Sequence, residues 1–364
     1  MVLISTPHLL RQVPRSCRTL PGLQHRRSIH IFRDIPSLRS HRRTLLETKS
    51  TSIGLVPTMG ALHPGHLSLI RLAAQENTHV IVSIYVNPTQ FGVSEDLSSY
   101  PKTWDADLRL LRELDSELKR TPGHGTLEAV FAPTTKEMYP TLPPDSRLDG
   151  VGSFVHITPL ANLLEGKTRP VFFRGVATVC MKLFNIVAPS RVYFGQKDVQ
   201  QTVVIKRMVK DFHLDLEVRV AGTEREGDGL AMSSRNVYLG ERRRRVGSVL
   251  VRALRAAQGA YVWGEKGRGE VLAPAWRVLE RVRAEQDALS PERRASIEVD
   301  YISLADPETL EEVEEVDVKR GAVLSGAVKM LPVEVVREGE RVGLGGDRGV
   351  VRLIDNIILE GRGS

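Results

Sequence analysis

The stretch GLVPTMGALHPGHLSLI, residues 54–70, decides the fold. Its first half belongs to an apolar run over 53–58, which predicts a buried β-strand. Apolar residues at helical spacing then predict a helix over about 61–76. Two histidines, His63 and His66, fall in the turn between them. A strand that runs directly into a helix is the building unit of α/β folds.

The same alternation of apolar runs and helical patterns continues along the chain. Further strands are predicted at 79–87, 127–133, 190–195 and 214–223, and further helices at 107–120, 175–188 and 198–212. Strands that alternate with helices predict a parallel sheet with helices on both faces. We therefore expect an α/β, Rossmann-like domain over residues 29–222.

Beyond residue 236 the pattern changes, and we expect a smaller C-terminal α+β lid domain over residues 223–364. Its predicted elements are two strands (297–306 and 321–328), one basic amphipathic helix (241–262) and two Gly-rich, charged loops (263–270 and 336–349). A run of four arginines, Arg242 to Arg245, is expected on the solvated flank of that helix.

The positive charge is concentrated at the N-terminus. The 364-residue chain has a net charge of +7, and residues 1–44, with nine arginines and one acidic residue, carry +8 of it, which leaves −1 for the rest. The core therefore lacks the charge of a nucleic-acid-binding protein. Residues 1–28 are predicted to be a basic extension, either disordered or a mitochondrial transit segment. A cytoplasmic location is the first expectation and a mitochondrial one the alternative.

The apolar content also excludes some classes. No apolar run reaches the length of about 18 residues that predicts a transmembrane helix, so we expect no membrane partner. The two cysteines, Cys17 and Cys180, do not form a disulfide framework. Cys180 lies in an apolar helical pattern and is expected to be a small buried hydrophobic residue.

The turn with His63 and His66 is suited to binding phosphate. Free backbone N–H groups at a helix start form an anion site, and Gly60 and Gly65 allow a ligand to approach the backbone. Two imidazoles on one helical face can donate hydrogen bonds to phosphoryl oxygens. Two alternatives stay open at this point: a zinc-binding pair, and histidines that only shape the helix start.

Polar motifs also follow other predicted strands, and the carboxyl ends of parallel strands meet at one edge of the sheet. GQKDVQQ follows 190–195 and offers Lys197 as a cation for phosphates. Gln90 and Gln201 are neutral amides suited to a small carboxylate. The segment DGLAMSSRN offers two hydroxyls and an arginine for a phosphate clamp.

Five motifs, taken in order, resemble one family. VPTMGALHPGHLSLI, VSIYVNPTQFGVSEDLSSYPKT, FFRGVATVCMKLFNIVAPSRVYFGQKDVQQ, DGLAMSSRN and LIDNIIL are similar to those of the pantothenate synthetases, or pantoate–β-alanine ligases. His63 to His66 resembles the HxGH signature of their nucleotidyltransferase superfamily. The resemblance implies an AMP-forming ligase. It would condense pantoate with β-alanine through a pantoyl adenylate and release pyrophosphate and AMP, as a homodimer in pantothenate and coenzyme A biosynthesis.

The resemblance also implies roles for particular residues. The catalytic residues would be His66, as a proton donor, with His63 and Lys197. The ATP site would consist of Met59, Gly60, Ala61, Leu62, His63, Pro64, Gly65, His66, Gly195, Gln196, Lys197, Asp198, Glu224, Met232, Ser233, Ser234 and Arg235. Gln90 and Gln201 would bind pantoate, and Gln90 also β-alanine. Mg²⁺ would accompany ATP, with Asp107 as a candidate for an outer contact, made to a group that binds the metal and not to the metal itself. The family often has Glu where Gln196 stands, which weakens a charge role there.

Two other functions remain as hypotheses. A nucleotidyltransferase acting on a phosphorylated acceptor would share the same turn, but such a site would be expected to add cations where Gln90 and Gln201 supply neutral amides. A non-enzymatic nucleotide- or RNA-binding module is favoured only by the basic N-terminus, and the charge of −1 on the rest opposes it. We therefore expect no nucleic-acid partner.

Overall fold

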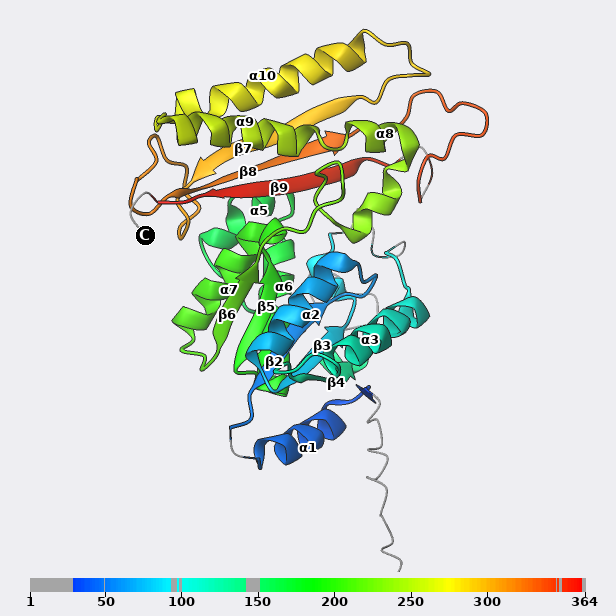
Figure 1. Ribbon diagram of the computed structural model, residues 1–364, viewed down its shortest axis with the longest axis vertical. Helices are drawn as coiled ribbons and strands as arrows, with labels where there is room; N and C mark the ends of the chain where they lie inside the picture. The colour runs from blue at the N-terminus through cyan, green and yellow to red at the C-terminus, as the bar shows by residue number, and fades with distance from the viewer. Residues whose placement is uncertain are drawn as a thin grey trace, which may run out of the picture.

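The computed structural model describes residues 29–48, 50–92, 97, 100–141, 151–344, 346 and 349–361. The predicted N-terminal extension, residues 1–28, lies outside these residues. The described chain forms a six-stranded and a three-stranded sheet, each with its own helices (Figure 1).

The larger sheet is parallel and has the strand order β1-β4-β3-β2-β5-β6. Its strands are β1 (His30–Phe32), β2 (Ile53–Thr58), β3 (His79–Ile84), β4 (Thr126–Phe131), β5 (Arg191–Gly195) and β6 (Glu217–Ala221). From β2 the chain builds toward β3 and β4 on one side, and later toward β5 and β6 on the other. The switch point between β2 and β5 is where open α/β sheets bind ligands. The predicted Rossmann-like parallel sheet is confirmed.

Helices cover both faces of this sheet. One face carries α1 (Ile35–Leu46), α6 (Phe172–Val187) and α7 (Val199–Asp211), and the other carries α2 (Pro64–Glu76) and α3 (Trp104–Leu118). Short helices α4 (Thr135–Met138) and α5 (Glu165–Thr168) lie in the connections, as do the 3₁₀ turns η1 (Pro88–Gln90), η2 (Leu160–Asn162) and η3 (Gln196–Asp198). Along β3, Val80 and Val82 pack toward α2 and α3, whereas Ile81 packs toward α6. This period of two explains the β-branched run, because both faces are buried.

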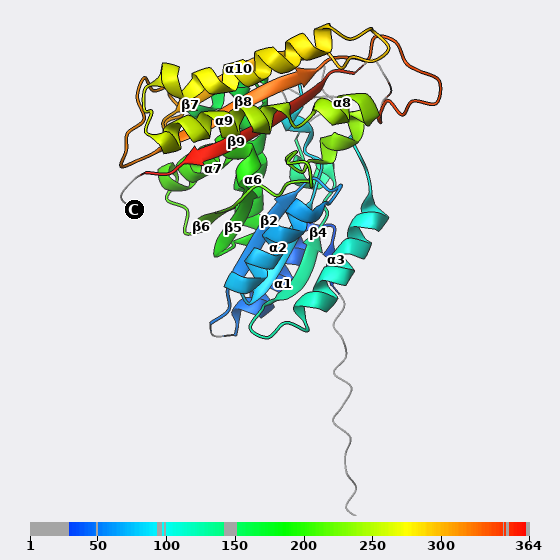
Figure 2. The same ribbon diagram turned by 45° about the horizontal axis from the view of Figure 1, so that its top comes forward.

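The smaller sheet is antiparallel, in the order β7-β8-β9. Its elements are η4 (Ser234–Tyr238), α8 (Gly240–Val246), α9 (Val249–Trp263), α10 (Arg268–Asp287), β7 (Ile297–Ala305), β8 (Ala322–Met330) and β9 (Val351–Leu359). Figures 1 and 2 show α9 and α10 on the side of this sheet that faces away from the larger domain. The segment predicted as one helix is interrupted between Val246 and Val249, and the predicted loop at 263–270 already contains the start of α10.

The expectation that the arginine run is solvated is wrong for two of its members. Arg242 and Arg243 are only 3% and 1% exposed. The guanidinium of Arg243 donates to the backbone carbonyls of Leu239, Val342 and Gly349, at 3.0, 3.0 and 2.6 Å. Burial of this charge is tolerated because carbonyl oxygens replace its water. The arginine thereby joins Val342 and Gly349 to α8.

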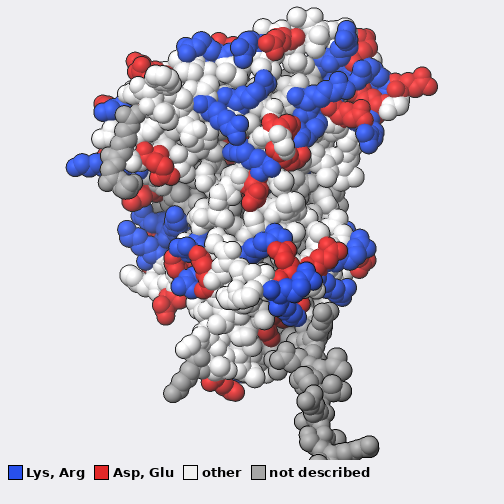
Figure 3. All heavy atoms as spheres, in the orientation of Figure 1, with Lys and Arg blue, Asp and Glu red and all other residues white. Residues whose placement is uncertain are grey.

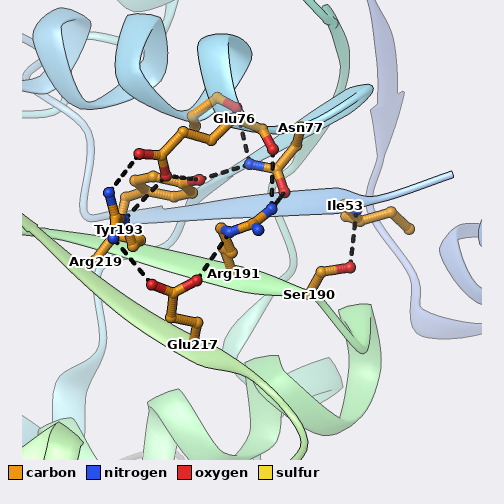
Figure 4. Close-up of polar contacts among 9 residues, drawn as sticks. Ile53, Glu76, Asn77, Ser190, Arg191, Tyr193, Glu217 and Arg219 are labelled. Carbon is orange, nitrogen blue, oxygen red and sulfur yellow. Dashed lines mark hydrogen bonds and ion pairs between the residues drawn. The ribbon is translucent and has the colours of Figure 1, made fainter. Parts of the chain in front are cut away.

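Polar side chains join the helices to the strands at the amino ends of β5 and β6 (Figure 4). The buried hydroxyl of Tyr193 donates to Glu76 at 2.8 Å and accepts from the Asn77 amide at 2.6 Å. Arg219 forms ion pairs with Glu76 and Glu217, at 2.6 and 2.9 Å. These contacts fix the C-terminal end of α2 against the amino ends of the strands.

The surface carries charges of both signs. On the face shown in Figure 3, basic and acidic side chains are interspersed over both sheets and their helices. Among the described residues, no helix is both long and apolar enough to cross a membrane.

Candidate active site

A cavity of about 740 Å³ opens at the carboxyl ends of the parallel strands, and residues of the smaller domain complete its wall. The predicted site residues that line it are Met59, His63, Gly65, His66, Gln90, Gly195, Lys197, Asp198, Gln201, Glu224, Met232, Ser233, Ser234 and Arg235. The structure therefore brings together residues that are up to 176 positions apart in the sequence. Gly60, Ala61, Leu62, Pro64 and Gln196 lie outside the lining, and their contact with ATP stays a prediction.

The buried carboxylate of Asp107 holds the turn between β2 and α2. This carboxylate accepts hydrogen bonds from the backbone N–H groups of Ala61 and Leu62, at 3.0 and 2.8 Å. Ala61 has a φ of +50°, a left-handed conformation that is uncommon for residues other than glycine. Asp107 is 2% exposed and is not part of the cavity wall. Both of its oxygens thus accept hydrogen bonds that shape the turn, and the predicted outer contact of Asp107 to a metal stays a prediction.

His63 and His66 lie against each other at the start of α2, with ring centroids 4.0 Å apart. The His63 backbone N–H points at Nδ1 of His66, 3.4 Å away, which favours the tautomer with its proton on Nε2. A Cβ atom on Gly65 would lie 3.0 Å from the His63 ring, so a larger residue there would displace that ring. Nδ1 of His63 is buried and lacks a hydrogen-bond partner within the described chain. A buried polar atom without a partner at a cavity wall indicates a ligand position.

Both rings are held neutral. Burial, followed by the neighbouring charge of Lys197, lowers the pKa of His63 to about 4. Burial, followed by repulsion from His63 and Lys197, lowers the pKa of His66 to about 3. At neutral pH each imidazole is therefore a neutral hydrogen-bond donor, and Lys197 supplies the positive charge.

Lys197 is positioned by a residue that sequence reasoning missed. Asn356, on β9 of the smaller domain, donates from its amide to the carbonyls of Gln196 and Lys197, at 2.8 and 2.9 Å. The Gln196 side chain in turn donates to the Asn356 oxygen at 3.2 Å. The neighbouring Asp355 forms a two-pronged ion pair with Arg225, at 2.6 and 2.9 Å. The motif LIDNIIL is part of the family resemblance, but only the fold shows what it supports. Its Asn356 holds the Lys197 turn, and its Asp355 holds Arg225.

The segment that begins at Glu224 forms a further part of the cavity wall. Its backbone turns back on itself, because Met232 donates to the carbonyl of Glu224 at 2.9 Å. Ser234 lies 3.2 Å from the Tyr100 hydroxyl, and the guanidinium of Arg235 lies 5.6 Å from the Tyr100 ring. The two serines and the arginine therefore face the cavity together, as the sequence predicts.

Gln90 is fixed in the deeper part of the cavity. Its side-chain oxygen accepts from Asn87 at 3.0 Å, and its amide points at the Met59 sulfur, 3.2 Å away. Asn87 also donates to the carbonyl of Gly175, at 3.1 Å. A Cβ on Gly175 would lie within 2.5 Å of the Gln90 backbone, so the close approach of α6 to this turn requires glycine. Asn87 was missed as a site residue, although it precedes the turn in the motif NPTQF.

A phosphate-binding turn at the switch point of a parallel sheet, with a lysine on the adjacent strand end and a second domain across the opening, defines a nucleotide-binding α/β enzyme. A family model described as pantoate-beta-alanine ligase matches residues 30–358. The chain belongs to this family.

Individual relatives agree with this assignment. The chain is 47% identical over 309 residues to the pantothenate synthetase of Roseiflexus castenholzii, a match that covers 85% of this chain and 93% of the relative. The pantothenate synthetase structure from Thermus thermophilus is 35% identical, with a TM-score of 0.71 and coverage of 91% and 100%. A pantoate-beta-alanine ligase structure from Francisella tularensis is 29% identical, with a TM-score of 0.60 and coverage of 91% and 98%. It is described as complexed with beta-gamma ATP and beta-alanine.

Proposed function

We propose that this protein condenses pantoate with β-alanine in two steps, through a pantoyl adenylate that is formed from ATP in the first step. Membership of the ligase family supports the overall reaction. The observation that supports the two-step route is that the His63–His66 turn, Lys197 and the amides of Gln90 and Gln201 line one cavity. Phosphate groups and a small carboxylate substrate can therefore be held next to each other.

In the first step, the pantoate carboxylate attacks the α-phosphorus of ATP and pyrophosphate leaves. Gln90 and Gln201 would orient pantoate, and the two neutral imidazoles would donate hydrogen bonds to the α-phosphoryl oxygens. Lys197 and Arg235 would balance the charge that develops on the phosphates. Because these donors are already fixed by the fold, little reorganisation is needed when charge moves.

In the second step, the β-alanine amine attacks the acyl carbon of the adenylate and AMP leaves. The amine must be neutral to attack, and the buried cavity disfavours its charged form. The imidazoles, which are neutral at pH 7, are hydrogen-bond donors to the leaving AMP. Reaction would proceed without a covalent enzyme intermediate.

Several finer assignments accompany this proposal. Mg²⁺ would arrive with ATP and neutralise phosphate charge. Of the carboxylates in the cavity wall, Asp198 and Glu224 reach solvent and fit an outer contact; 43% of the Asp198 side chain is exposed. We further propose the domain division at 222/223, a homodimer, pantoate as the acyl substrate and a cytoplasmic location. Import by residues 1–28 is the alternative, and it concerns residues outside the described chain.

The reaction is tested with purified protein, ATP, pantoate and β-alanine. The expected products are AMP, pyrophosphate and pantothenate, and formation of ADP would exclude the adenylate route. Exchange of labelled pyrophosphate into ATP should require pantoate and no β-alanine. Exchange without pantoate would favour a nucleotidyltransferase instead. A His66→Ala variant should lose roughly 10²–10³-fold in turnover, the usual effect of removing one donor to a developing charge.

A further inference from the structure

A second cluster of titratable side chains lies at the opposite end of the parallel strands from the cavity. It consists of His30 at the start of β1, His41 on α1, His79 at the start of β3 and Glu128 on β4. The family motifs do not include these four residues, and the proposed reaction does not use them. Ring centroids of His30 and His41 are 4.7 Å apart.

A β-bulge directs Glu128 into this cluster. Val80 pairs with Leu127 and Ile81 with Ala129, so Glu128 is the extra residue opposite the β3 backbone. A bulge of this kind re-aims a side chain without breaking the sheet. Glu128 is 8% exposed although it carries a carboxylate, so its charge must be met by specific partners.

The two oxygens of Glu128 have different surroundings. Oε1 lies 2.8 Å from Nε2 of His41, and the ring of His30 is tilted against that of His41. Oε2 lies 3.1 Å from Nδ1 of His79 and 3.5 Å from the hydroxyl of Thr126. One oxygen of the carboxylate is thus oriented by His79, and the other faces His41, beside which His30 lies.

We propose that His30, His41 and Glu128 bind a divalent transition metal ion, Zn²⁺ in particular, and that His79 orients the carboxylate from behind. One donor atom from each of the three ligands lies within 4.8 Å of the other two. Zinc bonds of about 2.0–2.1 Å place neighbouring tetrahedral ligands roughly 3.3 Å apart. Small rotations of the side chains, chiefly that of the exposed His30, would bring the donor atoms from within 4.8 Å to this spacing. Water would take the fourth position.

The competing explanation is a metal-free network in which Glu128 pairs only with His41 and His79. It leaves His30 without a function, since its ring nitrogens make no hydrogen bond in the described part of the chain. Imidazole and carboxylate ligands together suit zinc, and a ligating carboxylate is normally hydrogen-bonded by a further residue, as His79 does here. The ion would link β1 and α1 to β4, and so act on stability.

The test is zinc retention by tag-free protein that has been stripped with a chelator, loaded with ZnCl₂ and passed through gel filtration. We expect the wild type to retain a single equivalent, measured by mass spectrometry of the metal, and to melt at a higher temperature with zinc. The variants His30→Ala and Glu128→Gln should lose that equivalent and the shift. His79→Ala should weaken zinc binding roughly 10–100-fold. The exposed His156→Ala is the matched control and should behave as wild type.

His30→Ala is the decisive variant, because His30 is exposed and its loss does not threaten folding. It also separates this site from zinc bound by His63 and His66, which it leaves intact. Ligase turnover should stay at the wild-type value in His30→Ala, because the cluster is at the far end of the sheet. The proposal is overturned if the wild type retains no zinc, or if His30→Ala and Glu128→Gln retain zinc as the wild type does.

Discussion

The neutral state of His63 and His66 makes a specific prediction about stability and pH. Burial lowers the pKa of His63 to about 4 and that of His66 to about 3, both below the unperturbed value of 6.5. The unfolded chain therefore binds more protons than the folded chain below about pH 6.5. It follows that the free energy of unfolding falls as the pH drops from about 6.5 toward 4. The stability that comes from burying His63 and His66 as neutral rings is fully present only above about pH 6.5.

The magnitude follows from the position of each pKa. At about pH 5, an unfolded histidine is mostly protonated while His66 in the folded chain stays neutral. The difference is about 1.5 pH units, or about 2 kcal/mol, from a value of roughly 1.4 kcal/mol per unit. His63 and His66 are both half-buried, so solvent screening makes each contribution smaller than the pKa shift alone gives. Glu128 does not interfere, because its lowered pKa, about 2, costs stability only below about pH 4.5.

The assay is urea unfolding of the wild type and of His66→Asn at about pH 7.5 and pH 5. Asparagine keeps a polar atom near the Nδ1 position, to which the His63 N–H points. The wild type should lose up to about 2 kcal/mol more than the variant between the two pH values, and the exposed His156→Asn should match the wild type. Titration of the ring protons by NMR measures the same quantity directly. A midpoint near 6.5 for His66, or equal pH dependence in wild type and His66→Asn, would refute the reasoning.

Three further predictions concern positioning and packing. Asn356→Ala removes two hydrogen bonds to the backbone beside Lys197, so kcat/KM for ATP should fall by roughly 10²-fold. The control Asn185→Ala, which removes an exposed amide, should leave kcat/KM unchanged, and equal kcat/KM in the two variants would contradict the positioning role of Asn356. Gly175→Ala places a Cβ 2.4 Å from a backbone oxygen of the η1 turn, so KM for pantoate should rise, and an unchanged KM would show that the turn moves freely. Tyr193→Phe leaves buried polar partners unsatisfied and should lower the unfolding free energy by about 1–3 kcal/mol in urea, and no change would show that water replaces the hydroxyl.

The strands of the larger sheet were predictable because their signal is local. The β-branched run at 79–87 contains β3, and the apolar run at 53–58 is β2 itself. Helix α10 was missed because Gly269 and Pro274 interrupt its pattern; its residues Val271, Leu272 and Ala275 are buried in the core of the smaller domain. Such burial depends on partners that are distant in sequence, which local periodicity does not contain.

The site shows the same division between local and distant causes. The residues that line the cavity could be predicted because strand ends and helix starts have a local pattern, as His63 and Lys197 show. The burial of Arg243 could not be predicted, since two of the carbonyls that accept from it, those of Val342 and Gly349, lie about a hundred residues away in the sequence. Asn356 was missed for the same reason, because a strand of a different sheet supports the Lys197 turn.

The carboxyl ends and the amino ends of the parallel strands suit different ligands for a physical reason. At the carboxyl edge, helix starts leave backbone N–H groups free, which suits anions, and the histidine turn and Lys197 lie there. At the amino edge, helices end and leave carbonyl groups, which suits cations and donors. The Arg191 guanidinium donates to the carbonyl of Glu76 at 2.9 Å at this edge, and the Glu128 cluster lies there too. Substitutions at the amino ends should therefore change stability while leaving the chemistry of ligation intact, whereas substitutions at the carboxyl ends should change ligation itself.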